Sequence, residues 1–212
     1  MDLKRVFQNI SRTSCPYDMN FHCHTKYSDG SLDPIDLYIQ ANTLGLSHIA
    51  VTDHHSIQAY LDIYGFLKIN NNKIYKTKLW SGVEITSLLN NCLVHILAFN
   101  FDVESKYLSP YLLNNSVKGD LLEASNVIKN IKKANGLSFL AHPARYRIPY
   151  TNLINEAAIL GIDGVEVWYD YDRKSEWKVS TFVCESIEKI VNKNNLLISC
   201  GTDTHGISLL KR

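Results

Sequence analysis

The stretch His48-Ile49-Ala50-Val51-Thr52-Asp53-His54 decides the fold, because it is a short apolar run that ends in side chains able to bind a metal. An apolar run of this length that does not alternate with polar residues is typical of a strand covered on both faces. Similar runs recur along the chain, with amphipathic helical patterns between most of them. This alternation predicts an α/β fold with a parallel sheet, either open or closed into a barrel. The expected strands are Asn20–Cys23, His48–Thr52, Lys78–Glu84, Leu93–Phe99, Leu137–Ala141, Asp163–Tyr169 and Leu196–Gly201.

The helical patterns carry their own start and stop signals. Asp33 is placed to cap a helix that has Pro34 at its first position and that stops at Gly45. Residues 1–19 are expected to be an N-terminal extension with at most a short helix packed outside the core, and residues 20–212 to form one domain. The other expected helices are Ile57–Leu67, Val117–Ala134, Tyr150–Leu160 and Lys174–Asn194.

The amino-acid composition excludes several classes of protein. The 212 residues are 45% hydrophobic, and 22 basic against 21 acidic side chains give a net charge of +1. This near-zero charge argues against a non-specific binder of duplex DNA, although a local basic patch could still hold a phosphate. No apolar run reaches the ~18 residues of a membrane span, and the first 19 residues lack a secretory signal. The five cysteines are scattered singly, so we expect a cytoplasmic protein without a disulfide framework.

Potential metal ligands follow or lie within every one of the expected strands, mostly at the C-terminal end. In barrels and open parallel sheets, the C-terminal strand ends form one face, where ligands and catalytic groups converge. A group of several imidazoles and carboxylates is too polar to be buried unpaired, so bound cations are the natural way to satisfy it. The residues concerned are His22, His24, Asp29, Asp53, His54, Glu84, His95, His142, Glu166, Asp203 and His205.

The His-x-His spacing of His22 and His24 supports this interpretation. Residues two apart on a strand share a face, so both imidazoles can bind one ion while Cys23 points away. Taken singly, His22 or His95 would more often be a hydrogen-bonded core histidine than a ligand. Independent core histidines have no reason to share the same strand end, so the whole set favours a metal site.

The same residues resemble the motifs of the polymerase and histidinol phosphatase (PHP) superfamily of metal-dependent phosphoesterases. The resemblance spans residues 20–206 and implies a distorted (β/α)7 barrel, similar to a TIM barrel, with a trinuclear metal site. The motif Ser28-Asp29-Gly30-Ser31 and the stretch 141–146 resemble the branch that acts on nucleotides and short RNA ends, whereas histidinol phosphatases tend to have His where Asp29 stands. The matching stretches are Phe21-His22-Cys23-His24-Thr25, Ser28-Asp29-Gly30-Ser31-Leu32, Val51-Thr52-Asp53-His54, Gly82-Val83-Glu84-Ile85, Val94-His95-Ile96-Leu97, Ala141-His142-Pro143-Ala144-Arg145-Tyr146 and Gly201-Thr202-Asp203-Thr204-His205-Gly206.

The resemblance also implies a set of ligands for each of two to three divalent ions. Mixed imidazole and carboxylate donors suit Mn, Fe or Zn. Many nucleotide-acting relatives carry a lid domain between His95 and His142, where this chain has space for one loop and one helix. The implied ligands are His22, His24, Glu84 and Asp203 for a first ion, Glu84, His95 and His142 for a second, and Asp29, His54 and His205 for a third.

The expected activity is hydrolysis of phosphate esters of nucleotides, as a nucleoside 3′,5′-bisphosphate phosphatase or a short-RNA 5′–3′ exonuclease. A hydroxide that bridges two metals would be the nucleophile, Asp203 and His205 would act with it, and Arg145 would grip the substrate phosphate. The expected partner is a phosphorylated small molecule, a nucleotide or a short oligonucleotide, with neither duplex DNA nor a membrane. Two alternatives stay open: a phosphatase for a small metabolite such as histidinol phosphate, and an inactive metal-stabilised module.

Several further residues have two readings. Asp53 would orient a ligand histidine or cap a helix, Glu166 would support a ligand or pair with a cation, and His55 would line the mouth or face solvent. His48 is expected to be structural because it begins its strand at the opposite end. Weaker phosphate-binding candidates are Lys26 and Arg147, and the residues that could stack on a base are Tyr27, Tyr146, Trp168, Tyr169 and Tyr171.

Overall fold

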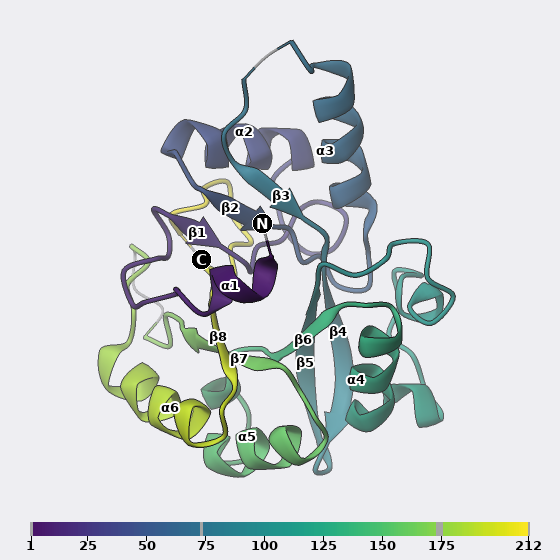
Figure 1. Cartoon of the computed structure of the whole chain (residues 1–212), viewed down its shortest axis with the longest axis vertical. Helices are drawn as coiled ribbons and strands as arrows, with labels where there is room; N and C mark the ends of the chain where they lie inside the picture. The colour runs from purple at the N-terminus through teal and green to yellow at the C-terminus, as the bar shows by residue number, and fades with distance from the viewer. Residues whose placement is uncertain (1, 73, 173–175, 212) are drawn as a thin grey trace.

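The computed structural model describes residues 2–72, 74–172 and 176–211, which form a mixed α/β fold with two sheets (Figure 1). The first sheet contains β1 (Met19–Asn20), β2 (His48–Ala50) and β3 (Lys78–Trp80), all parallel to one another. The second sheet has the order β4-β5-β6-β7-β8. Its strands are β4 (Gly82–Leu89), β5 (Cys92–Phe99), β6 (Leu137–Leu140), β7 (Gly164–Trp168) and β8 (Leu197–Cys200).

The second sheet departs from the expected parallel arrangement. Strands β6, β7 and β8 are parallel, but β4 and β5 form an antiparallel hairpin, and β5 is also antiparallel to β6. The hairpin turns at Asn90 and Asn91, whose φ angles of 50° and 56° have the positive sign that a tight two-residue hairpin turn requires. The single expected strand Lys78–Glu84 is in fact two strands, because the chain leaves one sheet after Trp80 and enters the other at Gly82.

Isolated bridges join the two sheets where the strands end. Cys23 pairs with Thr204, and His54 pairs with Glu84. The amide of Phe21 also donates to the carbonyl oxygen of Cys200 at 3.0 Å. These contacts bring the carboxyl ends of β1, β2 and β8 beside the beginning of β4. The α/β class is confirmed, and closure of the sheets into one barrel stays a prediction.

Helices cover both sheets (Figure 1). Helix α2 (Pro34–Leu44) begins as expected, because Asp33 accepts a hydrogen bond from the amide of Ile35 at 3.0 Å, and it ends at Gly45 with φ 80°. It packs against α3 (Gln58–Ile69) beside the first sheet. The second sheet is flanked by α4 (Ala124–Lys133), α5 (Tyr150–Ile159) and α6 (Thr181–Lys193), with 3-10 turns η1 (Ser109–Tyr111), η2 (Gly119–Leu122) and η3 (Pro143–Arg145).

Two of these helices are shorter than expected. The first residues of the expected helix Val117–Ala134 form loop and the 3-10 turn η2, so α4 begins only at Ala124. Helix α6 begins at Thr181, and the expected beginning at Lys174 lies outside the described residues. Among the described residues, every helix is too short or too polar to cross a bilayer.

The N-terminal helix α1 (Leu3–Phe7) belongs to the core. Its residues Leu3, Val6 and Phe7 are buried, at the helical spacing that makes one apolar stripe. The Phe7 ring centroid lies 4.7 Å from that of Phe21 and 4.4 Å from that of Phe139. The expectation that this helix packs outside the core is therefore wrong, because the Phe7 ring packs against core aromatic rings that include Phe139 of β6.

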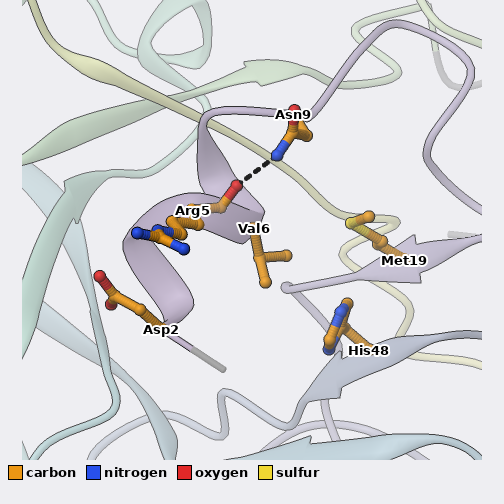
Figure 2. Close-up of a pocket in the computed structure, with 6 residues that line it drawn as sticks. All are labelled: Asp2, Arg5, Val6, Asn9, Met19 and His48. Carbon is orange, nitrogen blue, oxygen red and sulfur yellow. Dashed lines mark hydrogen bonds between the residues drawn. The ribbon is translucent and has the colours of Figure 1, made fainter.

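A pocket of about 480 Å³ lies between α1 and the first residues of β1 and β2 (Figure 2). It is therefore at the opposite strand ends from the expected metal ligands. His48 lines this pocket, and its Nδ1 accepts a hydrogen bond from the indole Nε1–H of Trp80 at 3.2 Å. This bond confirms the expected structural role of His48. Burial lowers the pKa of its imidazole, and the nearby Lys78 lowers it further.

Candidate metal centre

Four side chains form a buried group at the carboxyl ends of the strands: His22, His24, Glu84 and Asp203. Their potential ligand atoms all lie within 4.8 Å of one another. Glu84 Oε2 is 3.1 Å from His22 Nε2, and Asp203 Oδ1 is 3.2 Å from His24 Nε2. These are the residues that the sequence resemblance assigns to the first ion.

A second group faces solvent and shares His24 with the buried one. It consists of His24, Asp29, His54 and His205, again with ligand atoms within 4.8 Å. Asp29 Oδ2 lies 3.2 Å from His205 Nε2 and 3.7 Å from His54 Nε2. The Asp29 side chain is 54% exposed, so this side of the cluster is open to a ligand from solution. The resemblance assigns Asp29, His54 and His205 to the third ion, and the structure adds His24.

Glu84 connects the buried group to two further histidines. Its Oε1 lies 2.8 Å from His95 Nδ1 and 3.3 Å from His142 Nε2, while its Oε2 faces His22. Glu84 is only 1% exposed, so both carboxylate oxygens point into the protein. His54 also joins Glu84 and His95 in one group with ligand spacing. The carboxylate is thus placed to bridge two ions.

Hydrogen bonds to neighbours orient the rings of two candidate ligand histidines. His22 Nδ1 lies 2.9 Å from Glu166 Oε1, and His205 Nδ1 lies 2.8 Å from the carbonyl oxygen of Asp203. Carboxylate and carbonyl oxygens only accept, so each Nδ1 carries a proton, and each Nε2 is the ring atom that could bind an ion once it is deprotonated. Glu166 also accepts from the amide of His142 at 2.9 Å. Of the two roles expected for Glu166, the structure shows the first, as the hydrogen-bond partner of a candidate ligand histidine.

Asp53 orients the candidate ligand His24 through the hydroxyl of Ser28. Ser28 Oγ donates to Asp53 Oδ1 at 2.6 Å and lies 3.4 Å from His24 Nδ1, to which its oxygen is available as an acceptor. Asp53 also accepts from the amide of Thr25 at 2.7 Å and from its hydroxyl at 2.6 Å. The carboxylate therefore holds the loop after β1 and, with it, the ring of His24. Ser28 had no assigned role in the sequence beyond its place in the motif.

The backbone at the strand ends adopts conformations that suit close convergence. His142 and Asp203 have φ angles of 27° and 52°, which non-glycine residues rarely adopt. The backbone at position 201 lies so close to His22 that only glycine fits. A Cβ there would lie 2.2 Å from Cβ of His22 and 2.6 Å from its backbone nitrogen. Strained or closely packed backbone of this kind is found where surrounding structure holds functional groups in place.

The electrostatics of the cluster favour a cation. Burial alone would raise the pKa of the Glu84 carboxyl, but the imidazoles of His22 and His95 hold that pKa well below its ordinary value. Burial lowers the pKa of His24, yet Asp203 and Glu84 beside it raise the pKa to about 9. The pKa of His54 is lowered to about 4, mainly by burial. At neutral pH the Glu84 carboxylate is therefore ionised and His54 is neutral, whereas His24 carries a proton that it must release before it binds an ion.

Several buried polar atoms of the cluster have no hydrogen-bond partner, and bound ions would satisfy them. Among the described residues, four buried ligand-type atoms have no hydrogen-bond partner, although neighbouring ligand atoms lie close by. Glu84 Oε1 and His95 Nδ1 are 2.8 Å apart without hydrogen-bond geometry. Two atoms held this close without a hydrogen bond are spaced as two ligands of one ion would be. The four atoms are His24 Nε2, Glu84 Oε1, His95 Nδ1 and His142 Nδ1.

Arg145 lies at the cluster, where the sequence predicted a phosphate-binding group. Its NH1 donates to Asp203 Oδ2 at 2.9 Å and to the hydroxyl oxygen of Tyr169 at 3.1 Å. Tyr169 in turn donates to Asp203 Oδ2 at 2.6 Å. Tyr169 and Trp168 are buried, so the expectation that either could stack on a base is wrong. Tyr169 instead helps to orient the carboxylate of Asp203.

The remaining candidates have partners within the protein. The hydroxyl of Tyr27 donates to Asp62 at 2.6 Å, and Lys26 pairs with Asp33. His55 is buried, with its Nδ1 bonded to the carbonyl oxygen of Tyr111 at 3.1 Å. Both readings of His55, at the mouth or in solvent, are therefore wrong. Its ring instead ties the site to the loop that carries η1.

Comparisons with known proteins give a curated relative in sequence and two solved structures with a similar fold. A 5′-3′ exoribonuclease of Haemophilus influenzae is 28% identical over 152 residues, which cover 66% of this chain and 53% of that protein, so the chain spans about half the length of this curated relative. A protein of Bifidobacterium adolescentis assigned as a metal-dependent phosphoesterase superposes with a TM-score of 0.71 at 20% identity, over 90% of this chain and 88% of the other. An amidohydrolase of Chromobacterium violaceum superposes with a TM-score of 0.72 at 16% identity, over 89% and 88%. The PHP domain model matches residues 20–201, which include every candidate ligand except Asp203 and His205, and the chain belongs to the PHP domain family.

Proposed function

We propose that this protein is a metal-dependent phosphoesterase that hydrolyses phosphate esters of nucleotides. The observation that carries the proposal is the convergence of nine histidine and carboxylate side chains in overlapping groups with ligand spacing. Membership of the PHP family and the similarity to a 5′-3′ exoribonuclease support a phosphate ester of a nucleotide or a short RNA end as substrate. The proposed ligands are His22, His24, Asp29, His54, Glu84, His95, His142, Asp203 and His205.

Mixed imidazole and carboxylate donors suit Mn, Fe or Zn, and such ions activate water near neutral pH and neutralise phosphoryl oxygens. The chain itself orients the donors. Glu166 holds the proton on Nδ1 of His22, and the carbonyl oxygen of Asp203 does the same for His205, so that both Nε2 atoms face the cluster. Glu84 supplies negative charge to both halves of the cluster from a buried position.

The open side of the cluster defines where a substrate enters. Asp29, His54, His95 and His205 are all partly exposed, whereas the buried group lies behind them. Arg145 is held beside this opening by Asp203. A guanidinium in that position offsets the negative charge of a phosphoryl group through charge-assisted hydrogen bonds. A phosphate ester therefore enters on the Asp29 side and meets positive charge from Arg145 and from the ions that these side chains would hold.

A phosphate-release panel with Mn tests the proposal. The substrates are adenosine 3′,5′-bisphosphate, a 5′-phosphorylated dinucleotide and histidinol phosphate, and the variants are His22→Ala and the matched control His48→Gln. We expect release from the first two substrates by the wild type and by His48→Gln, and background release by His22→Ala. Preference for histidinol phosphate would refute the nucleotide assignment. Release by His22→Ala at the wild-type rate would refute catalysis at this cluster, and no release from any substrate would indicate an inactive module.

A further inference from the structure

The backbone amide of His95 has a side chain as its acceptor where the sheet would normally supply a carbonyl oxygen. Strands β5 and β6 are antiparallel, and the register that pairs Ile96 with Leu140 places His95 opposite Ala141. In a regular antiparallel ladder, the two residues of a hydrogen-bonded pair exchange two bonds. Here Ala141 donates its amide to the carbonyl oxygen of His95 at 3.0 Å, whereas the amide of His95 donates to the hydroxyl oxygen of Tyr146 at 2.7 Å.

This substitution of one acceptor for another coincides with a sharp turn of the chain after Ala141. The next residue, His142, has a φ of 27° and a ψ of 61°, far from the extended backbone that a continuing strand would need. The 3-10 turn η3 follows and brings Tyr146 back beside β5. Tyr146 therefore supplies the acceptor that the ladder loses where β6 ends.

The ring of Tyr146 contacts a second candidate ligand histidine. Its centroid lies 5.4 Å from that of His142, with an angle of 51° between the two planes. His142 Nε2 lies 3.3 Å from Glu84 Oε1, and His95 Nδ1 lies 2.8 Å from the same oxygen. Tyr146 is partly buried and packs against the larger hydrophobic core, which holds its ring in place. One side chain thus touches both histidines that flank one carboxylate oxygen, the first through its hydroxyl and the second through its ring.

We propose that Tyr146 is a positioning residue for the second ion, the one assigned to Glu84, His95 and His142. The hydrogen bond to its hydroxyl oxygen fixes the backbone of His95, and its ring fixes the orientation of the His142 imidazole. Groups that orient the ligands of a metal ion control the affinity for that ion. The inference rests on the metal centre of the proposed function, and it gives Tyr146 a role that acts through the two histidines rather than through the substrate.

Calorimetric titration of the metal-free protein with Mn tests the proposal without any substrate. Tyr146→Phe removes the acceptor and keeps the ring, and we expect the affinity for one equivalent of Mn to fall about 10–100-fold relative to the others. Tyr146→Leu also removes the aromatic ring and is expected to weaken the same equivalent further. The matched control is Tyr38→Phe, which removes a buried hydroxyl that donates to the carbonyl oxygen of Thr77 at 2.7 Å in a separate core cluster. Tyr38→Phe is expected to keep the wild-type Mn isotherm.

Phosphate release separates positioning from direct contact with the substrate. If Tyr146 acts through an ion, Tyr146→Phe reaches the wild-type kcat at saturating Mn, and the Mn concentration for half-maximal release rises about 10–100-fold. A wild-type Mn isotherm in Tyr146→Phe would overturn the inference. A loss of kcat that excess Mn does not restore would also overturn it, because the tyrosine would then act on the substrate itself.

Amide hydrogen exchange of the metal-free protein checks the hydrogen bond directly. The amide of His95 is expected to be protected in the wild type and in Tyr38→Phe and to exchange faster in Tyr146→Phe. An unprotected His95 amide in the wild type would overturn the inference even if Tyr146→Phe failed to fold. Failure of the proposed function gives a different pattern: Mn binding by the wild type without phosphate release would refute the phosphoesterase alone, and no Mn binding by the wild type would overturn the metal centre and the inference together.

Discussion

Replacing Glu84 by Gln removes the one charge that both halves of the cluster share. The amide has the size and shape of the carboxylate, so packing around this buried position is kept. It loses the negative charge that faces His22 Nε2 at 3.1 Å and His95 Nδ1 at 2.8 Å. If these residues hold ions, Glu84→Gln weakens binding on both sides of the bridge. The thermal stabilisation that divalent metal gives to the protein therefore falls.

The size of that effect follows from binding linkage. For one site at a metal concentration of one hundred times Kd, binding stabilises the native state by ~2.7 kcal/mol. At roughly 2–4 °C per kcal/mol for a chain of this size, the melting temperature rises by about 5–11 °C. Loss of an outer partner of a metal site costs about 10–100-fold in affinity, and a bridging ligand belongs at the upper end. With a 100-fold loss, the same metal concentration gives ~0.4 kcal/mol, or about 1–2 °C.

Thermal melts with and without Mn measure the difference. The control is Glu185→Gln, which makes the same chemical change at an exposed glutamate whose carboxylate lies 3.9 Å from Arg12 on the surface. Glu185→Gln is expected to keep the wild-type rise in melting temperature. An equal rise in Glu84→Gln would refute the bridging role, and the absence of any rise in the wild type would refute metal binding by the cluster.

Three further substitutions test the fold at Gly201 beside the cluster, at Phe7 in the core and at His48 at the opposite strand ends. Gly201→Ala forces a Cβ into the neighbouring backbone and is expected to cost about 1–3 kcal/mol in urea unfolding, whereas Gly65→Ala, with open space around it, is not destabilising. Phe7→Ala is expected to cost about 3–5 kcal/mol and Phe182→Ala, at an exposed position, less than about 0.5 kcal/mol; equal costs would contradict the core position of α1. Because burial lowers the folded-state pKa of His48, the unfolded chain binds its proton first as the pH falls below about 6.5, so the wild type is expected to lose more stability than His48→Gln between pH 7.5 and 5.5. Parallel pH dependences of the two proteins would contradict that last expectation.

The convergence of the candidate ligands could be predicted because buried imidazoles and carboxylates at strand ends need partners of opposite charge or bound ions. Polar side chains such as Glu84 and Asp203 follow apolar runs, and the ends of such runs converge in any sheet of this class. The structure brings these residues to within 4.8 Å of their neighbours. Their binding of metal stays a prediction.

The hairpin could not be predicted from hydrophobic runs alone. The residues after Glu84 alternate between buried and partly exposed positions, whereas a continuous apolar run was taken as the sign of a strand. The dipeptide Asn90-Asn91 was an available signal, since asparagine tolerates the positive φ of a tight hairpin turn. This signal predicts the antiparallel pair on either side of it, but not the break between Trp80 and Gly82.

Other differences arise from tertiary contacts that local sequence does not contain. The stripe of Leu3, Val6 and Phe7 indicates an amphipathic helix but does not specify which surface it covers. Tyr169 follows a strand end like the ligands do, yet its hydroxyl turns inward to Asp203 because that carboxylate needs a donor. Similarly, His55 is directed away from the cluster by the carbonyl oxygen of Tyr111.

The most direct test of a metal-dependent phosphoesterase centre is a titration of metal-stripped protein with Mn while phosphate release from adenosine 3′,5′-bisphosphate is followed. The account predicts background release without metal and a rise that saturates at two to three equivalents of Mn per chain. Full release by the stripped protein, or no release at any amount of Mn, would contradict it.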